Sequence, residues 1–213
     1  MTNVIRKKEK AQITYNELGL LESRYFDVPV DIATSIGTIK AEFLTYYDNG
    51  QIEYLFPRYG KINAFWTEED EYSLASDYIY YCGKQQLSFK PQCFHFYPDG
   101  HIQSFTIWNK QILYIKTKHG LIGTRKGFSL NKNGEIESIE PVLGTRIKVG
   151  KTEYYAYDPE DFPFHADNNS LLLGSDGSIN SFKAIHTVKN DDGSSKWITE
   201  IINVNDKNSV FIV

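Results

Sequence analysis

Four segments of the chain repeat one pattern around a glycine: LTYYDNGQIEYL (44–55), FHFYPDGHIQSF (94–105), FSLNKNGEIESI (128–139) and LLLGSDGSINSF (171–182). Each has Asn or Asp before the glycine, Ile two residues after it and a large apolar residue five after it. Apolar residues also stand six and four positions before the glycine, and the residue between them is mostly polar. This period of two is typical of a strand with one buried face, so the pattern predicts four β-hairpins.

The repeated glycines are predicted to close the turns; they are Gly50, Gly100, Gly134 and Gly177. A three-residue loop, in which a type I turn is closed by glycine in the left-handed conformation, pairs position −4 with the Ile at +2, counted from the glycine. In the same register position −6 pairs with +4, so Phe94 should face Ser104. The apolar residue at +5 then lies on the opposite face, which requires a strongly twisted sheet, a bulge or a second covering layer.

Composition favours strands throughout the chain, because Tyr, Phe and Trp number 15, 13 and 3 against a single Met, and aromatic residues pack well on a pleated surface. One segment differs, WTEEDEYSLASDY (66–78), where Thr67 precedes a run of acids suited to a helix N-terminus. We predict an all-β fold of successive antiparallel β-hairpins in a repeat-like twisted sheet, with one short helix near 67–76. Further strands are expected at 111–116, 146–149 and 153–157. The expected organisation is an N-terminal segment, 1–30, and a single β-hairpin repeat domain, 31–213, with hairpins centred on 50, 100, 134 and 177.

The stretch YYDNGQIEYL resembles the repeat of MORN-like proteins, particularly the divergent form found in bacterial YwqK-type proteins, and the other three copies resemble it less closely. The second glycine pair of a true MORN unit is absent. The resemblance implies a long sheet of successive hairpins and a role in protein or membrane-surface interactions rather than catalysis. FWTEEDEY and GTIKAEF are also similar to a group of bacterial proteins of unknown function, and this second resemblance implies no activity.

A formal charge of −4 and a pI near 5.8 exclude wholesale binding to nucleic acid or to an anionic membrane, since both need a basic field. The basic cluster 6–10 is expected to be a solvated tail. There is no apolar stretch long enough for a membrane span and no apolar signal core, so we expect a cytoplasmic location and free thiols at Cys82 and Cys93.

Aromatic residues crowd the first two hairpins. If some of them lie on an uncovered face, they would form a platform for a sugar or a partner chain, because aromatic rings bring large, rigid contact area with a polar edge. The candidate binding residues are Tyr47, Tyr54, Tyr97 and Trp108. The alternative is that these rings fill the core, as aromatics at alternating strand positions usually do.

Two groups of residues offer chemistry. The loop YDPEDFPFHADNN (157–169) concentrates the candidate metal ligands Asp158, Asp161, His165 and Asp167; oxygen-rich loops hold Ca²⁺ or Mg²⁺, and a histidine among carboxylates can act as a base. The same composition is also that of a plain loop. Cys93 and His95 project to one face of a strand, although a third catalytic partner is not evident.

Common enzyme signatures are missing from the sequence, and we expect neither a catalytic residue nor a cofactor. The leading hypothesis is therefore a protein–protein binding or scaffolding module whose partner is another protein, with homodimerisation as a further possibility. The alternative is a small-ligand binding protein, for sugar or metal, or a hydrolase with its site at loop 157–169. The C-terminal SVFIV (209–213) should be either docked as a strand or buried in a dimer, and we expect the first.

Overall fold

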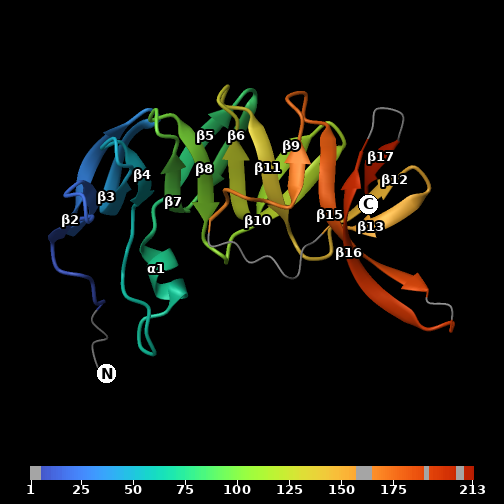
Figure 1. The fold of residues 1–213 in the computed structure, drawn as a ribbon, viewed down its shortest axis with the longest axis horizontal. Coiled ribbons are helices and arrows are strands. Elements are labelled where there is room, and N and C mark those ends of the chain that lie inside the picture. Colours follow the sequence, from blue (N-terminus) through green and yellow to red (C-terminus); the bar gives the residue numbers. More distant parts are fainter. Residues whose placement is uncertain (1–5, 157–164, 190–191, 205–208) are drawn as a thin grey trace. The chain divides into compact units, whose positions relative to one another are not determined.

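The computed structural model describes residues 6–156, 165–189, 192–204 and 209–213. The chain forms two compact units, and Figure 1 labels their strands and the helix. The first comprises residues 1–80 and 88–111, and the second comprises residues 81–87 and 112–213. The boundary predicted between residues 30 and 31 lies inside a strand, Leu21–Thr34.

The first unit carries a sheet with the strand order β1-β2-β3-β4-β7-β8. Its elements are β1 (Gln12–Tyr15), β2 (Leu21–Thr34), β3 (Gly37–Tyr46), β4 (Ile52–Phe56), α1 (Glu68–Leu74), β7 (Pro91–Phe96) and β8 (Ile102–Ile107). A separate two-stranded hairpin is made by β5 (Tyr78–Cys82) and β6 (Gln85–Phe89), and its residues 81–87 belong to the second unit. All pairings between these sheet strands are antiparallel.

The second unit has the strand order β10-β11-β14-β15-β13-β12-β17, and β9 pairs with β10 while β16 pairs with β15. Its strands are β9 (Leu113–Thr117), β10 (Gly120–Leu130), β11 (Ile136–Pro141), β12 (Arg146–Val149), β13 (Thr152–Tyr155), β14 (Leu171–Leu173), β15 (Ile179–Lys189), β16 (Ser195–Asn203) and β17 (Val210–Ile212). The predicted all-β class of hairpin-connected antiparallel strands with one short helix is confirmed.

The four repeated turns have the predicted conformation. In each, the N–H of the glycine donates to the carbonyl at position −3, and the N–H at −3 donates to the carbonyl at +1; in the second copy these bonds join Gly100, Tyr97 and His101, at 2.8 Å each. The glycine φ angles lie between +75° and +85°, the left-handed region that a side chain resists. Position −4 faces the Ile at +2 in all four hairpins.

The predicted pairing of position −6 with +4 is wrong, because each of the four hairpins contains a bulge. In the second copy Phe94 faces Phe105 and His95 faces Ser104, and the register shifts between His95 and Phe96. The extra residue at +3 rotates the second strand by one position. The apolar residues at −6 and +5 therefore share the buried face, and each of them is at most 1% exposed. Of the three explanations left open by the sequence, the bulge is the one found.

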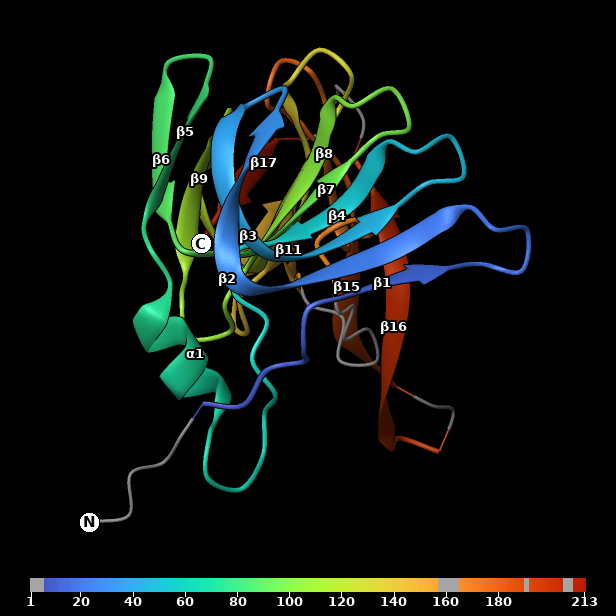
Figure 2. The ribbon, with the colours of Figure 1, turned by 90° about the vertical axis from the view of Figure 1, so that its left-hand side faces the viewer.

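A fifth hairpin of the same kind joins β1 to β2. Gly19 (φ +75°) closes it, Tyr15 faces Leu21, Thr14 faces Ser23, and the bulge follows in the same place. The sequence pattern missed this copy because Leu precedes the glycine and an arginine stands at +5. Figure 2 shows the turns of β1–β2, β3–β4 and β7–β8 on one side of the first unit. Side chains link neighbouring turns: Asn49 Nδ2 donates to the Pro98 carbonyl at 2.9 Å.

Helix α1 begins at the predicted position, after Thr67, and its N-terminus is closed by a capping box. The Asp70 N–H donates to the Thr67 hydroxyl at 3.3 Å, and the Asp70 carboxylate accepts from the Thr67 N–H at 2.7 Å. Four acids in the first turn complement the positive end of the helix. The buried residue of this helix is charged: it is Glu71, and the apolar residues of the helix are not buried.

The expectation that the C-terminal segment docks as a strand is confirmed. β17 pairs with β12, where Val210 faces Val149 and Ile212 faces Ile147. Val210 and Ile147 are both buried. The predicted strand 146–149 matches β12, and the predicted strand 153–157 overlaps β13.

Candidate functional site

Tyr47 and Tyr54, two of the predicted binding residues, pack around His95. The Tyr47 hydroxyl donates to the Phe96 carbonyl at 2.8 Å and lies 3.1 Å from His95 Nε2. Since a hydroxyl has a single proton and a carbonyl can only accept, His95 Nε2 must carry the proton of the second bond. Tyr54 stacks on the same imidazole with ring centroids 4.1 Å apart. Both tyrosines are half-buried, so they offer a partner only part of their rings.

The other two predicted binding residues, Trp108 and Tyr97, differ in their burial. Trp108 is 4% exposed, and its indole N–H donates to the Pro91 carbonyl at 3.1 Å. It therefore belongs to the core and not to an exposed platform. Tyr97 is half-buried at the start of its turn. Cys93 is buried and takes part in no disulfide, as expected of a small residue packed within a strand.

Of the predicted metal ligands, Asp158 and Asp161 lie outside the described residues. His165 and Asp167 are half-buried in the turn that precedes β14. Within the described part of the chain, there is no group of three or more His, Cys, Asp or Glu side chains placed to hold a metal ion. The metal site at loop 157–169 therefore stays a prediction.

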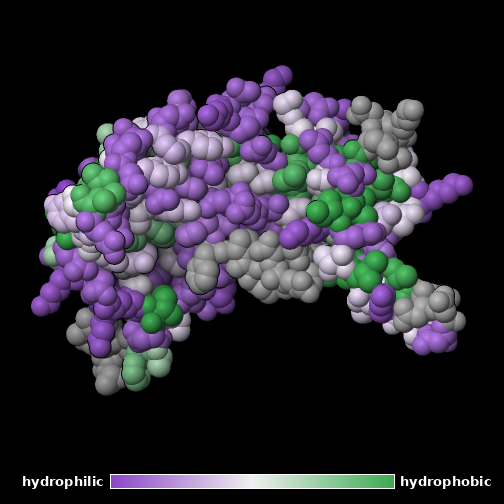
Figure 3. Space-filling view, in the orientation of Figure 1, coloured by the Kyte–Doolittle hydropathy of each residue, from purple (hydrophilic) through white to green (hydrophobic). Residues whose placement is uncertain are grey.

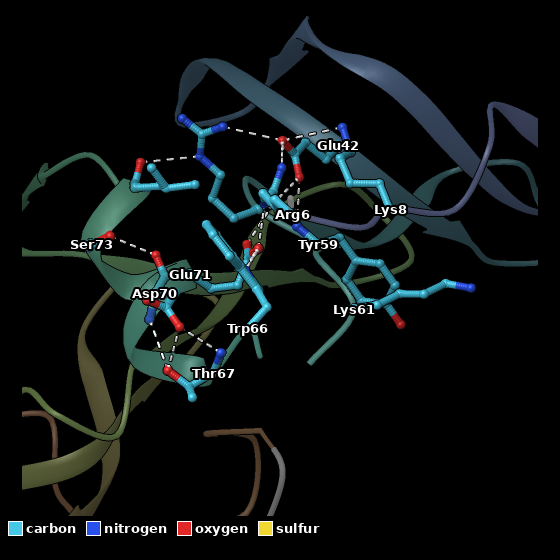
Figure 4. A network of polar contacts seen from close by, with 12 residues as sticks. Arg6, Lys8, Glu42, Tyr59, Lys61, Trp66, Thr67, Asp70, Glu71 and Ser73 are labelled. Carbon is cyan, nitrogen blue, oxygen red and sulfur yellow. Dashed lines mark hydrogen bonds and ion pairs between the residues drawn. The ribbon is translucent and has the colours of Figure 1, made fainter. Parts of the chain in front are cut away.

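A buried ion network in the first unit was not foreseen (Figure 4). Glu42 on β3 and Glu71 on α1 each have side chains that are 1% exposed, and Arg6 bridges them. The guanidinium Nη1 and Nη2 donate to Glu42 at 2.9 and 2.7 Å, while Nε and Nη2 donate to Glu71, the latter at 2.6 Å. This paired geometry is the strongest that arginine offers to carboxylates.

Glu42 has further partners. The Tyr59 N–H donates to it at 2.8 Å, Arg58 Nη1 at 3.2 Å, and Lys8 Nζ lies 3.3 Å away. Burial alone would raise the pKa of Glu42, but the hydrogen bonds from Arg6 and Tyr59 and the nearby positive charges outweigh it and lower the pKa to about 2. Glu42 is therefore ionised at neutral pH and is not available as an acid or a base.

The cluster 6–10 is accordingly not the solvated tail that the sequence suggested, because Arg6 and Lys8 are held by buried carboxylates. The Lys61 N–H also donates to the Lys7 carbonyl at 2.8 Å, and Lys61 pairs with Glu9. The network joins the N-terminal segment, β3 and α1. Its role is to hold these elements together, since every carboxylate oxygen is engaged in ion pairs or hydrogen bonds.

A third buried carboxylate, Glu140 on β11, lies in the second unit and is fully buried. It accepts from the Ser170 N–H at 2.8 Å and from Arg125 at 3.4 Å. Burial raises the pKa of Glu140, and the hydrogen bonds from Ser170 and the charge of Arg125 offset this only in part. Beside it, Asn169 Nδ2 donates to the Ser138 hydroxyl at 2.8 Å. These contacts fix the C-terminal end of the predicted loop 157–169 onto the sheet.

Hairpin turns of the second unit border a recess of about 750 Å³, and the residues that line it include Cys82, Gly134 and Gly177. The Cys82 thiol donates to the Gly134 carbonyl at 3.5 Å, and burial raises the pKa of the thiol, which disfavours the reactive thiolate. Next to it, the Gln85 amide donates to the Tyr114 carbonyl at 3.0 Å and accepts from the Lys116 N–H at 3.1 Å. Gln85 thereby occupies backbone groups on the outer side of β9, as an added strand would.

The outer side of β16 carries no such cap within the described residues, where β16 pairs only with β15. The Val204 N–H donates to the Asn180 carbonyl at 2.8 Å, and Ser181 faces Asn203. Because hydrogen-bonded and non-hydrogen-bonded pairs alternate in an antiparallel ladder, the N–H and C=O groups of Trp197, Thr199 and Ile201 point away from β15. β16 is nine residues long, so it presents a long, open edge of the kind that recruits another strand.

Apolar side chains stand on one face beside this edge. The register places Tyr155, Leu172, Trp197 and Ile201 on the same face, and they are 47%, 43%, 66% and 63% exposed. We call these four residues the apolar face of the second unit. Figure 3 shows hydrophobic side chains exposed over the part of the molecule that carries β15 and β16 in Figure 1. Among the described residues, β13 pairs with β15 only at Ile185, and the hairpin β15–β16 extends past that point.

The hairpin β15–β16 was not predicted beyond Phe182. A local signal existed: Asp192-Gly193 separates two runs rich in β-branched and apolar residues, which is typical of a hairpin. The buried network had no local signal in the sequence, because Arg6 stands 36 residues before Glu42 and 65 residues before Glu71.

Comparison of the chain with protein-family models, with curated proteins and with solved structures gave no match. The resemblance to MORN-like and YwqK-type proteins therefore stays a prediction. Within the described residues, every helix is too short and too polar to cross a bilayer.

Proposed function

We propose that this protein is a protein-binding module and that the hairpin β15–β16 is its contact element. The observation that carries the proposal is the edge of β16, open among the described residues, where the outward N–H and C=O groups of every second residue adjoin the exposed Trp197 and Ile201. A partner segment that adds as a strand would satisfy the backbone groups, and the apolar side chains would supply specificity.

The limited stability expected of the hairpin β15–β16 supports the same role. A two-stranded hairpin is marginally stable in water, and β15–β16 continues beyond its last pairing with β13. Trp197 on this hairpin is two-thirds exposed, and tryptophan is among the residues that contribute most at protein interfaces. A bound partner would cover this hairpin and offset the cost of ordering it.

The contrast with β9 strengthens the choice of β16. On β9 the side chain of Gln85 occupies the outer backbone groups of Tyr114 and Lys116, which protects the strand from pairing with another chain. We take the uncapped edge of β16 as the surface meant for a partner. The expected cytoplasmic location and the scaffolding role implied by the MORN-like resemblance are part of this proposal.

Site-specific photocrosslinking tests the proposal. A photoreactive phenylalanine replaces Trp197, and the matched control replaces Phe65, which is 76% exposed in the first unit. We expect an adduct from position 197 that maps to an extended segment, and none from position 65. Thr199→Pro in the same chain should remove the adduct, because it deletes an outward N–H while leaving the β15 pairing intact. An absence of adducts at 197, or an adduct unaffected by Thr199→Pro, would overturn the proposal.

A further inference from the structure

We infer that the strand added to β16 is β16 of a second copy of this chain, antiparallel to the first about a two-fold axis at Ile198. This inference rests on the proposed function and names its partner. A two-fold interface uses the same surface on both copies, so the strand must be complementary to itself in backbone, charge and side-chain packing.

The backbone meets the first requirement. With the axis at Ile198, Trp197 lies opposite Thr199 of the second copy, and Thr199 lies opposite its Trp197. Both positions have outward N–H and C=O groups, so each such pair can exchange two hydrogen bonds. Ile198 and its copy form a non-hydrogen-bonded pair at the axis, where side chains approach each other most closely.

Charge selects this register from its neighbours. Lys196 falls opposite Glu200 of the second copy, and the two-fold axis makes this pair twice. A register centred on Thr199 also aligns outward backbone groups, but it sets Lys196 against Ile202 and Ile198 against Glu200. Opposite charges directly across a ladder are favourable, whereas a charge against an apolar residue forgoes that gain. Glu200 Oε1 lies 3.3 Å from His186 Nδ1 on β15, so its carboxylate lies on the face of the sheet opposite the apolar face, the face that Lys196 shares by the register of β16.

The apolar face becomes continuous across the axis. Trp197 and Ile201 stand on the same face of β16, and in this register each Trp197 is diagonal to Ile201 of the second copy, within reach of an aromatic side chain. Pairing of the edges also removes the long open strand that each single chain presents. Backbone, charge and apolar contacts thus agree on one arrangement.

Sedimentation over a range of protein concentrations tests the inference by charge reversal. Lys196→Glu and Glu200→Lys alone should each weaken the dimer by about tenfold, because two attractive pairs become repulsive. The double variant should return to within about threefold of the wild-type dissociation constant. Lys40→Glu changes the charge equally on an exposed side chain of the first unit and should leave the dimer unchanged. Failure of the double variant to restore association would overturn the register.

Cysteine placement gives a second readout. Under mild oxidation Ile198→Cys should form a disulfide-linked dimer faster than Thr199→Cys, while the wild-type chain, with its own two thiols, should form none. The reverse order would overturn the axis at Ile198. A wild-type chain that stays monomeric at all concentrations would overturn the inference alone, because an adduct from position 197 with a different protein would still support the proposed function. A monomer without any such adduct would overturn both.

Discussion

Replacing Arg6 by Ala should destabilise the first unit more than any other single loss of an ion pair among the described contacts. The change removes four hydrogen bonds to two buried carboxylates. Breaking a buried pair by deleting one partner costs about 3–5 kcal/mol. The lowered pKa of Glu42, about 2 against an ordinary 4.5, corresponds to about 3 kcal/mol in favour of the ionised form, as the net of burial and of all its partners.

The lower end of this range applies, because Glu42 keeps Arg58 and the Tyr59 N–H, and Glu71 keeps the Trp66 indole at 2.7 Å. We therefore expect a loss of about 3 kcal/mol near pH 7, seen as a lower midpoint in thermal or urea unfolding followed by circular dichroism. The matched control is Arg146→Ala, which removes an exposed pair with Glu153 and should cost less than about 1 kcal/mol.

The pH dependence gives the result that would refute this reasoning. The folded-state pKa of Glu42 lies below its unfolded value, so its contribution is fully present above the unfolded pKa and is lost as the pH falls from about 5 to about 2. The Arg6→Ala variant lacks the part of that contribution that depends on Arg6, while the parts from Tyr59 and Lys8 remain. The stability gap between wild type and variant should therefore narrow in acid. A gap that stays constant, or one no larger than that of Arg146→Ala, would contradict a buried, ionised Glu42.

Three further outcomes follow from single contacts. Gly60→Ala should lower the free energy of unfolding, measured in urea, by about 2 kcal/mol or more. The Cβ of the new alanine would lie 1.8 Å from the buried Glu71 Oε1. Glu140→Gln should be neutral or stabilising at pH 7. Because the folded pKa of Glu140 is raised, the stability of the native protein falls as the pH rises through that pKa, and the amide removes this loss. A large destabilisation would argue that the ionised form is needed. Truncation after Asn208 deletes β17 and the buried Val210, and should lower the thermal midpoint by an amount equivalent to about 2 kcal/mol; unchanged stability would contradict the docking of β17.

Prediction of the fold succeeded where the signal is local. The turns, the −4/+2 pairs and the start of α1 each depend on residues within a few positions of one another, as in the Thr67–Asp70 capping box. It failed at the −6/+4 pairs, because an alternating pattern read outward from a turn assumes an unbroken ladder, and the bulge at +3 adds one residue to one strand only.

The candidate sites followed the same division. Aromatic residues near the turns were taken as a possible platform, yet Trp108 is buried and Tyr54 stacks on His95. Whether an aromatic at a strand position is core or surface depends on what covers that face, and the covering elements come from elsewhere in the chain. The metal ligands expected at Asp158 and Asp161 lie outside the described residues, so metal analysis of wild type and of the double variant with Asp161 and His165 changed to Ala remains their test.

The sequence by itself determined the glycine-closed turns, the strand type and the helix start, because backbone conformation and nearest hydrogen bonds settle these within a few residues. Only the tertiary structure decided that Arg6 bridges Glu42 and Glu71 and that a fifth hairpin precedes the four recognisable ones. It also decided that Gln85 caps β9, whereas the part of the chain that the structure describes leaves β16 open. The physical reason is that burial and edge exposure depend on which distant segments pack together. Those contacts turn a basic segment into a buried anchor and an ordinary strand into the surface we propose for a partner.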